Sequence, residues 1–409
     1  MKNNRIPELR FSDFSEEWDE EKLKVLAQFN KGNGYSKSDL CQTGIPAILY
    51  GRMYTNYETV IEEVNTFVEN ADNAVISEGD EVIVPASGES AEDIARASVV
   101  KASGVVLGGD INIIKPSNKV ISEFLALIIS NGRCHKELSR RAQGKSIVHL
   151  RNPDIKEIQI IYPTLEEQRK IAGFIISLEM SIKKQKVEIE NLKKIREGFL
   201  QKMFPKDGEL VPQLRFPGFT DDWEQRKLGE IAGSTFGGGT PSTKVAEYWN
   251  GNIPWIQSSD LKIDLLSDVT PTKHITEDAI LKSATKLIPG NSIAIVTRVG
   301  VGKLAYMPYA YATSQDFLAL SDLKVMAWFG TYSIYNLMKK EINNIQGTSI
   351  KRITKEDLLG KKILIPHEKS EQNKIGSFFG NIDNTITLHQ RQLEIFIETK
   401  KAFIQKMLI

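Results

Sequence analysis

The sequence repeats itself with a period close to half its own length. Residues 7–23, PELRFSDFSEEWDEEKL, return at residues 212–228 as PQLRFPGFTDDWEQRKL. Three shorter segments return at similar offsets of 203–205 residues: QGKSI (143–147) as QGTSI (346–350), EEQRKIAGF (166–174) as SEQNKIGSF (370–378), and FLQKMF (199–204) as FIQKML (403–408). This period is far too long for a solenoid repeat. We therefore expect two copies of one domain-plus-helix module, related by pseudo-twofold symmetry.

Composition places the chain among globular proteins. Its 409 residues suggest about two to three domains, and 41% hydrophobic with 26% charged residues is typical of domains with real cores. No apolar run approaches the ~18 residues that span a membrane, and the first residues do not resemble a signal peptide. Cys41 and Cys134 are isolated in the sequence. We expect a cytoplasmic protein with reduced thiols.

A heptad seam predicts a long amphipathic helix over residues 166–203, and the pattern recurs 204 residues later. Pro163 precedes the first helix, and Pro205 with Gly208 closes it. At 1.5 Å per residue, each helix is roughly 55–60 Å long. The seam positions are Ile171, Ile175, Leu178, Ile182, Gln185, Ile189 and Leu192 in the first copy, and Ile375, Phe379, Ile382, Ile386, His389, Leu393 and Phe396 in the second.

Polar residues interrupt both seams at matching positions. Gln185 corresponds to His389, and Arg196 corresponds to Lys400. We expect each helix to make a similar contact at these heights, most simply with the other helix, because a buried polar seam residue fixes register. His389 could instead be a metal ligand or a catalytic base. The seam role is favoured because no Cys, His or carboxylate stands near it at ligand spacing.

The segments 24–162 and 229–365 predict two α+β domains. Short β-rich runs alternate with helical stretches, and Gly, Asn and Asp separate them. The expected strands are 80–86, 104–114 and 291–299, and the expected helices are 120–130 and 331–342. The two bodies diverge in sequence, whereas the helices and their entries stay alike. This contrast predicts one scaffold that presents two different recognition surfaces.

The sequence offers no support for an active site. GVGKL (300–304) resembles a phosphate-binding loop, but Thr297 stands where that motif needs Gly, and Leu304 where it needs Ser or Thr. FGGGTPSTK (236–244) lacks a clear preceding strand and the spacing of a dinucleotide fingerprint, so we expect a flexible loop close to a ligand backbone. The sequence contains no HExxH, Gly-x-Ser-x-Gly or Asn/Asp-Pro-Pro-aromatic motif.

Taken together, these features resemble the specificity (S) subunit of type I restriction–modification systems, over essentially the whole chain. That family repeats a Gln-Gly loop, a strand ending in Pro, a helix start and a long helix with a Gln-x-Met end. The matching residues are Gln143, Gly144, Ser146, Ile160, Pro163, Leu165, Gln168, Ile171, Phe199, Gln201, Met203 and Phe204, and in the second copy Gln346, Gly347, Ser349, Ile363, Pro366, Gln372, Ile375, Phe403, Gln405 and Met407. The second copy departs by having Lys369 in place of Leu165.

The resemblance implies an α+β protein with two target-recognition domains (1–163 and 209–366), joined by two long antiparallel coiled-coil helices (164–208 and 367–409). It implies a DNA reader without catalytic activity, in which each domain reads half of a bipartite, asymmetric double-stranded site. Two methyltransferase subunits would dock on the helices, and restriction subunits would join them, so that the complex methylates adenine or cleaves DNA with ATP. S-adenosylmethionine, Mg²⁺ and ATP would then belong to the partners, and this chain would hold no cofactor.

Candidate DNA contacts follow from residue type, because Arg, Lys, Asn and Gln make most phosphate and base contacts. An ordinary surface role is an equal alternative for each of them. The candidates are Tyr35, Lys37, Arg52, Arg96 and Lys101 in the first domain, and Lys244, Gln257, Arg298 and Lys303 in the second. The competing hypothesis for the whole chain is a protein-interaction scaffold with a coiled-coil rod and no DNA role. A salt titration of DNA binding separates the two hypotheses.

Overall fold

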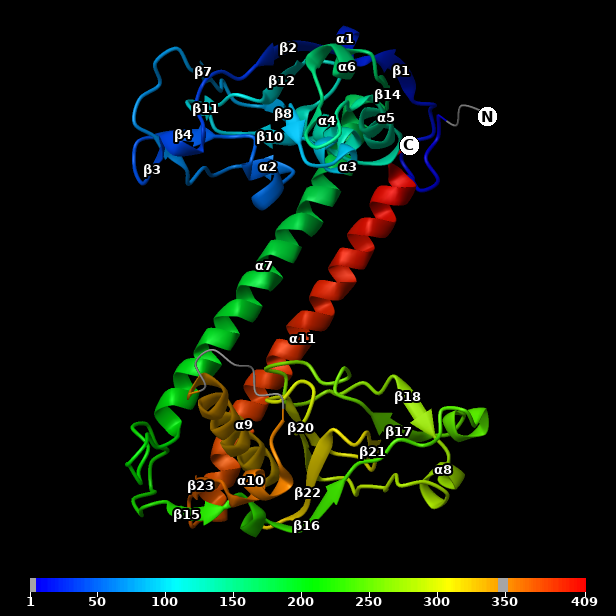
Figure 1. Ribbon diagram of the computed structural model, residues 1–409. Helices are drawn as coiled ribbons and strands as arrows, with labels where there is room; N and C mark the ends of the chain where they lie inside the picture. The colour runs from blue at the N-terminus through cyan, green and yellow to red at the C-terminus, as the bar shows by residue number, and fades with distance from the viewer. Residues whose placement is uncertain (1–4, 345–351) are drawn as a thin grey trace. The chain divides into compact units, whose positions relative to one another are not determined.

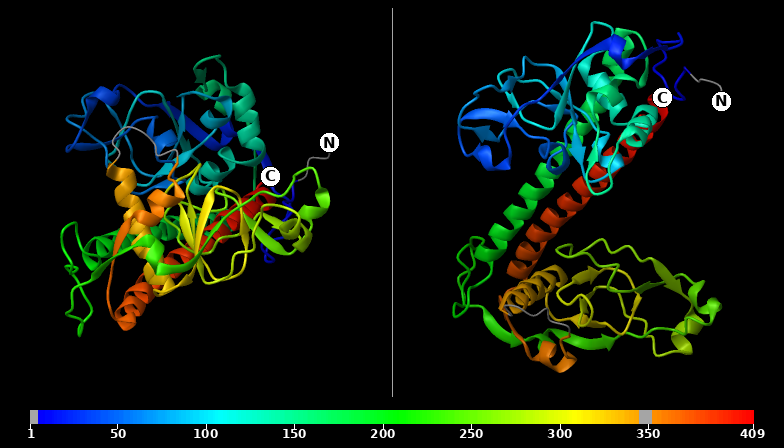
Figure 2. Two further views of the ribbon diagram at one scale, coloured as in Figure 1. Left: turned by 60° about the horizontal axis from the view of Figure 1, so that its bottom comes forward. Right: turned by 45° about the horizontal axis from the view of Figure 1, so that its top comes forward.

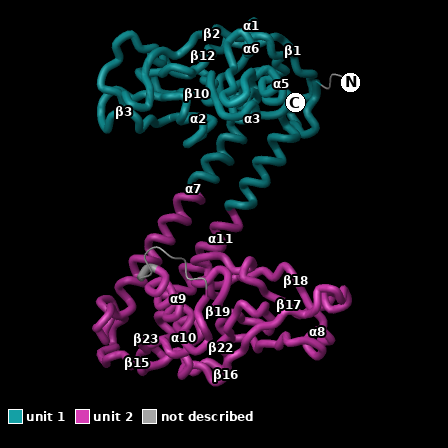
Figure 3. Tube along the Cα trace, in the orientation of Figure 1, with its two compact units in different colours: residues 1–184, 393–409 teal, residues 185–392 magenta. Residues whose placement is uncertain are grey.

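A computed structural model describes residues 5–344 and 352–409 (Figure 1). The chain divides into two compact units: unit 1 contains residues 1–184 and 393–409, and unit 2 contains residues 185–392 (Figure 3). Each unit combines one α+β domain with a segment from each of two long helices. The motif residues Gln346, Gly347 and Ser349 lie outside the described residues.

The two long helices are α7 (Leu165–Met203) and α11 (Lys369–Met407), each of 39 residues. They confirm the predicted helix over 166–203 and its second copy. In unit 1 the ring of Phe174 meets that of Phe403 at 4.7 Å between centroids, and Glu179 pairs with Lys400 at 2.6 Å. Since residue numbers rise on one helix as they fall on the other, the two segments run antiparallel, and they lie side by side in Figure 1 and in the right-hand view of Figure 2.

The helix segments of unit 2 are antiparallel as well. Gln185 contacts Gln392, and the Phe199 and Phe378 rings meet at 4.9 Å. Each unit therefore contains the same helix pairing, as the repeat in the sequence predicts.

Unit 1 holds two five-stranded sheets, ordered β2-β12-β8-β10-β5 and β3-β6-β4-β11-β7, and the two-stranded sheets β1-β14 and β13-β9. The strands are β1 (Asp19–Lys22), β2 (Ala27–Lys31), β3 (Leu40–Cys41), β4 (Ile45–Ile48), β5 (Val60–Ile61), β6 (Phe67–Val68), β7 (Val75–Ile76), β8 (Glu81–Pro85), β9 (Ser87–Gly88), β10 (Ser98–Val100), β11 (Val106–Leu107), β12 (Ile111–Pro116), β13 (Val148–His149) and β14 (Gln159–Tyr162). The short helices are α1 (Leu23–Leu26), η1 (Lys37–Asp39), α2 (Arg52–Thr55), α3 (Ala91–Ile94), α4 (Ser122–Ile129), α5 (Gly132–Arg141) and α6 (Asn152–Lys156).

Unit 2 holds a four-stranded sheet ordered β16-β22-β19-β20, a three-stranded sheet ordered β18-β17-β21, and the pair β15-β23. The strands are β15 (Glu224–Lys227), β16 (Ala232–Gly237), β17 (Ile253–Ile256), β18 (Lys273–Ile275), β19 (Ser292–Val296), β20 (Leu304–Met307), β21 (Ala312–Thr313), β22 (Phe317–Leu323) and β23 (Lys362–Ile365). The helices are η2 (Leu228–Ile231), η3 (Ala246–Trp249), α8 (Glu277–Leu281), α9 (Ala327–Asn344) and α10 (Lys355–Gly360). Among the described residues, no helix combines the length and apolarity that crossing a bilayer requires.

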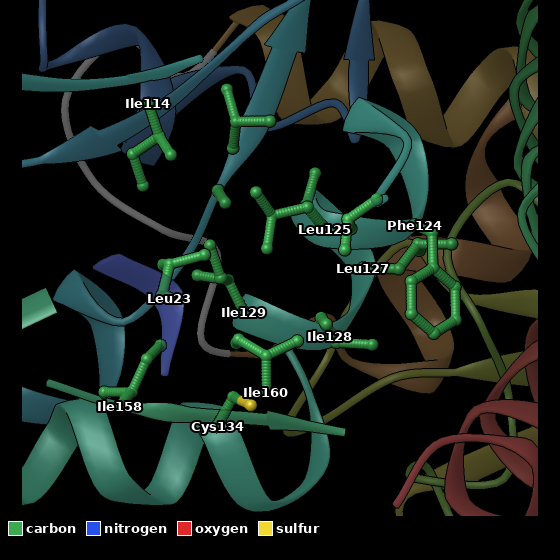
Figure 4. Packing of buried hydrophobic residues seen from close by; sticks show 14 of the residues in the cluster. Leu23, Ile114, Phe124, Leu125, Leu127, Ile128, Ile129, Cys134, Ile158 and Ile160 are labelled. Carbon is green, nitrogen blue, oxygen red and sulfur yellow. The ribbon is translucent and has the colours of Figure 1, made fainter. Parts of the chain in front are cut away.

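The main core of unit 1 forms where α4 packs on the sheet and on the start of α7. Helix α4 supplies Phe124, Leu125 and Ile129, with Cys134 of α5 and Ile160 of β14 beside them (Figure 4). Nearly every residue of α4 is buried, which explains why its sequence is a continuous apolar run rather than an amphipathic one.

A framework of contacts recurs in both units. Strand β1 pairs antiparallel with β14, as β15 pairs with β23. The Arg10 guanidinium binds Glu167 through two hydrogen bonds of 2.7 Å, and Arg215 binds Glu371 through bonds of 2.7 and 2.8 Å. The repeated tryptophans, Trp18 and Trp223, are each 1% exposed. The sequence motifs that return therefore encode how each domain attaches to its helices.

The same holds for the repeated glutamines at the helix starts. Gln168 donates to the carbonyl of Pro163 and accepts from the amide of Ile121. Gln372 donates to the carbonyl of Pro366 and accepts from the amide of Met326. Both side chains are buried, so each glutamine satisfies backbone groups that water cannot reach.

Two predictions about strands are wrong. The run 104–114 is not one strand, because it breaks between β11 and β12, where Asp110 has φ +57° and Gly108 packs so closely that a Cβ would lie 2.5 Å from Leu49. The segment 236–244 does have a clear preceding strand, β16. Its start is also packed rather than free, since a Cβ on Gly238 would lie 1.9 Å from the carbonyl oxygen of Ser314.

Candidate nucleic-acid interface

A cavity of about 1200 Å³ opens on unit 1 and gathers three of the predicted DNA-contact residues, Tyr35, Lys37 and Arg52. The loop after β2, helix α2 and the turn before β12 supply its walls. The remaining polar and charged lining residues are Lys31, Asn33, Ser36, Asp39, Tyr50, Thr55, Asn56, Asn65, Thr66 and Asp110. A concave surface with donors and acceptors on several elements is suited to hydrogen-bonding the edges of bases.

Local structure fixes two of these three side chains. Tyr35 has φ +53°, and its hydroxyl donates to the carbonyl of Asn70 at 3.0 Å. Arg52 binds the Glu58 carboxylate at 2.8 Å and the Asn65 side chain at 3.2 Å. Lys37 is exposed and has no ion pair within the described part of the chain. The pocket thus combines a positioned aromatic and guanidinium with one cation available to an anionic ligand.

The other two candidates of the first domain do not line this cavity. Arg96 lies 5.1 Å from the centroid of the Tyr54 ring and donates to the carbonyl of Met53 at 3.0 Å. Lys101 contacts Asp80 and Glu123, each at 2.5 Å. Burial alone would lower the pKa of Lys101, but these two acidic partners raise it. Contacts within unit 1 therefore occupy both cations.

In unit 2, three of the four candidates lie in one loop cluster at the ends of β17, β19 and β20. The ammonium of Lys303 donates to the carbonyl of Ser258, next to Gln257, at 2.9 Å. The amide of Arg298 donates to the carbonyl of Asp316 at 3.3 Å, in the turn that follows β21. Gln257 and Arg298 are half-buried. Lys244 is exposed in the separate loop between β16 and η3.

A second cavity, of about 680 Å³, lies beside β18 in unit 2 and was not foreseen from the sequence. Its lining includes Trp249, Asn250, Lys273 and His274. The ammonium of Lys273 lies 5.6 Å from the centroid of the Trp249 ring. Trp249 is half-buried at this rim. The only sequence signal was an aromatic residue next to an amide, which is too common to identify a site.

Most seam positions of α7 and α11 are buried or half-buried. His389 faces Gln185 across the helix pair of unit 2, with 2.5 Å between Nδ1 and Oε1, so the imidazole Nδ1–H donates to the amide oxygen. Among the described residues no three His, Cys, Asp or Glu side chains gather as metal ligands would.

The second pair of polar seam residues makes cross-helix ion pairs. Arg196 binds Asp383 at 2.6 Å in unit 2, and Lys400 binds Glu179 at 2.6 Å in unit 1. Glu179 and Asp383 are themselves 204 residues apart, so the two ion pairs are equivalent under the repeat. The sequence predicted the cations but missed both acidic partners, because they lie outside the seam columns.

Comparisons with known proteins agree with this arrangement. The family model described as "Type I restriction modification DNA specificity domain" matches residues 15–192 and again residues 220–399. The chain is 30% identical over 178 residues to the type I restriction enzyme MjaIX specificity subunit of Methanocaldococcus jannaschii, which is 42% of this chain and 41% of that protein. It is 33% identical over 202 residues to the type I restriction enzyme EcoR124I/EcoR124II specificity subunit of Escherichia coli, which is 44% of this chain and 48% of that protein.

Each of these two alignments thus spans less than half of the curated relative's own length. A solved structure extends the likeness of fold to the whole chain. The crystal structure of the type I restriction–modification S subunit from M. genitalium superposes with a TM-score of 0.69 at 14% identity, and the match covers 99% of both chains.

Proposed function

Because the chain belongs to the type I restriction–modification DNA specificity family, we propose that it reads a bipartite, asymmetric DNA sequence for a larger complex and has no catalytic activity itself. Residues 1–163 and 209–366 are the two target-recognition domains in this proposal. The helical regions 164–208 and 367–409 dock two methyltransferase subunits and the restriction subunits. In this proposal S-adenosylmethionine, Mg²⁺ and ATP bind to those partner subunits, and this chain itself binds none of them.

The observation that carries the proposal is the contrast between a repeated framework and two unlike surfaces. The attachment of each domain to its helices recurs contact by contact, as in the pairs Arg10–Glu167 and Arg215–Glu371. The surfaces that gather candidate DNA contacts do not recur. Two unlike readers on one repeated frame suit an asymmetric site, whereas two identical readers would suit a palindrome.

We assign base and phosphate contacts in the first half-site to Tyr35, Lys37 and Arg52, which share one cavity. In the second half-site we assign them to Gln257, Arg298 and Lys303, which share one loop cluster. Arg96, Lys101 and Lys244 are weaker candidates, because they lie outside these two groups.

Co-expression with the methyltransferase subunit of the same system tests the proposal. Modified-base sequencing of the host DNA should reveal N6-methyladenine at one gapped motif that is absent without this chain. A host methylation pattern that stays unchanged, with the assembled complex present, would contradict the proposal.

A domain exchange sharpens the result. Replacing residues 24–162 with those of a relative should change one half of the motif and leave the other half intact. A pure scaffold, the competing hypothesis, would leave DNA binding by the complex equally weak at all salt concentrations, whereas a DNA reader loses affinity steeply as salt rises.

A further inference from the structure

One repeated segment of the sequence is not part of the buried framework. Residues 143–147 are exposed in unit 1, and Ile147 is 58% exposed. The counterpart in unit 2, residues 346–350 (QGTSI), lies outside the described residues. A segment that recurs because it packs would be buried in its unit. An exposed segment that recurs indicates instead a contact with something that both halves of the complex meet.

The loop projects from a fixed base. Gln143 and His149 exchange two backbone hydrogen bonds of 3.0 and 2.8 Å, and Val148 pairs with Gly88 of β9. Gly144 has φ +141°, and a Cβ there would lie 1.9 Å from the carbonyl oxygen of Ile147, so only glycine fits this turn.

The tip of the loop offers hydrogen-bond donors. Within the described part of the chain, the backbone amides of Lys145, Ser146 and Ile147 have no acceptor. The Ser146 hydroxyl and the Lys145 ammonium add two more donors, and both side chains are exposed. Consecutive free amides beside a cation form the kind of surface that binds oxyanions.

Helix α5 extends this surface with positive charge. Residues 132–151 contain six Arg or Lys and a single acidic residue, Glu137, in a chain whose net charge is only +1. Arg133, Lys136 and Arg140 follow one another at spacings of three and four residues, which places them on one face of the helix. Among the described residues, Lys136 and Arg140 have no ion pair, and neither does Lys145.

This basic surface is tied to the cavity that holds the candidate base contacts. The Ser87 hydroxyl lies 3.1 Å from Nδ1 of His149 at the base of the loop. The Tyr54 hydroxyl donates to the carbonyl of Ser87 at 2.8 Å, and Tyr54 stands on α2 together with Arg52, which lines the cavity. Two hydrogen bonds thus connect the loop to the helix that carries a candidate base reader.

We propose that the outward face of α5 and the loop 143–147 bind the phosphate backbone of the DNA duplex, outside the base-reading cavity. This inference rests on the proposed function. Every half-site has the same backbone whatever its bases, which explains why the exposed loop recurs while the reading surfaces diverge. A methyltransferase subunit would also meet both halves, but the concentration of unpaired cations and free amides favours phosphate.

The test uses the complex of this chain with its methyltransferase subunits and a variant carrying Lys136→Ala, Arg140→Ala and Lys145→Ala. Fluorescence anisotropy at several salt concentrations measures its affinity for a target duplex and for a scrambled duplex. The slope of log affinity against log salt should become shallower by about 0.9 for each phosphate that the variant no longer neutralises. Affinity should fall by the same factor for both duplexes, so their ratio should stay unchanged.

Two controls belong to this experiment. Lys324→Ala removes an exposed lysine without an ion pair among the described residues, between β22 and α9, and should leave the slope unchanged. Replacing Lys136 and Lys145 by Arg keeps the charges and should preserve the parental slope.

An unchanged slope in the triple variant, or a weaker affinity confined to the target duplex, would overturn the inference. Dissociation of the methyltransferase subunits during size-exclusion chromatography would overturn it in favour of a protein contact. A parental complex that binds no DNA would contradict the proposed function itself.

Discussion

The equivalent ion pairs of the two units differ in environment although they occupy the same place in the repeat. In unit 2 the side chains of Arg196 and Asp383 are 2% and 0% exposed, and Tyr332 donates a second hydrogen bond to the carboxylate. In unit 1 the side chains of Lys400 and Glu179 are 27% and 21% exposed. The repeat thus fixes which helices meet, whereas the packing of each domain decides how much a given contact stabilises it.

The largest expected effect follows from breaking the buried pair. Arg196→Ala should lower the free energy of unfolding of unit 2 by about 3–5 kcal/mol, because it leaves a buried carboxylate without its partner. Lys400→Ala should lower that of unit 1 by only about 0–1 kcal/mol, because solvent screens its pair. Urea denaturation of both variants measures the difference. Equal decreases in the free energy of unfolding would show that the burial of the Arg196–Asp383 pair does not make it more stabilising than the Lys400–Glu179 pair.

The same variant has a predictable pH dependence. Burial raises the pKa of Asp383, and Arg196 opposes that rise. Without Arg196 the folded-state pKa moves further above the unfolded value, so protonation stabilises the folded variant. The difference in free energy of unfolding between the parent and Arg196→Ala should therefore become smaller as the pH falls from about 7 to about 5. A deficit that grows on acidification would contradict this.

The long helices were predictable because a heptad pattern over nearly forty residues averages out local exceptions. The heptad pattern could not reveal Asp383 as the partner of Arg196, because the two residues lie 187 positions apart in the sequence and on different helices. Strands failed where two or three residues decide the outcome. The break at Gly108–Asp110 depends on contacts with the distant loop around Gly34.

Single DNA contacts were the least predictable feature. Arg52 and Lys101 look alike in sequence, because each is a single cation that follows a mainly apolar run, AILYG (47–51) and ASVV (97–100). The fold places Arg52 on a cavity wall and Lys101 between Asp80 and Glu123. Only the tertiary structure decides which cation already has a partner, so residue type alone gives candidates without a ranking.

The helix-entry ion pairs offer a test in which the two units should behave alike. The side chains of Arg10 and Arg215 are both 11% exposed, and their glutamate partners are 0% and 2% exposed. Arg10→Lys and Arg215→Lys should each cost about 1–2 kcal/mol, because lysine keeps the charge but cannot make both hydrogen bonds. Denaturation of each unit measures this cost. A cost confined to one unit would show that these pairs are not equivalent.

The smallest expected effect concerns thiol labelling, which reports on unit 1 because both cysteines lie in that unit. A variant that weakens unit 2 should not change the labelling. Cys41 is exposed, whereas burial raises the pKa of the Cys134 thiol to about 12. A thiol reagent at about pH 8 should therefore modify Cys41 quickly and Cys134 only when unit 1 opens. Arg196→Ala weakens unit 2 and should leave the rate at Cys134 unchanged, whereas Arg10→Lys should raise that rate about tenfold. If Arg196→Ala also accelerated labelling of Cys134, the two units would unfold as one. The losses in unfolding free energy predicted for Arg196→Ala and Lys400→Ala could then not be assigned to separate units.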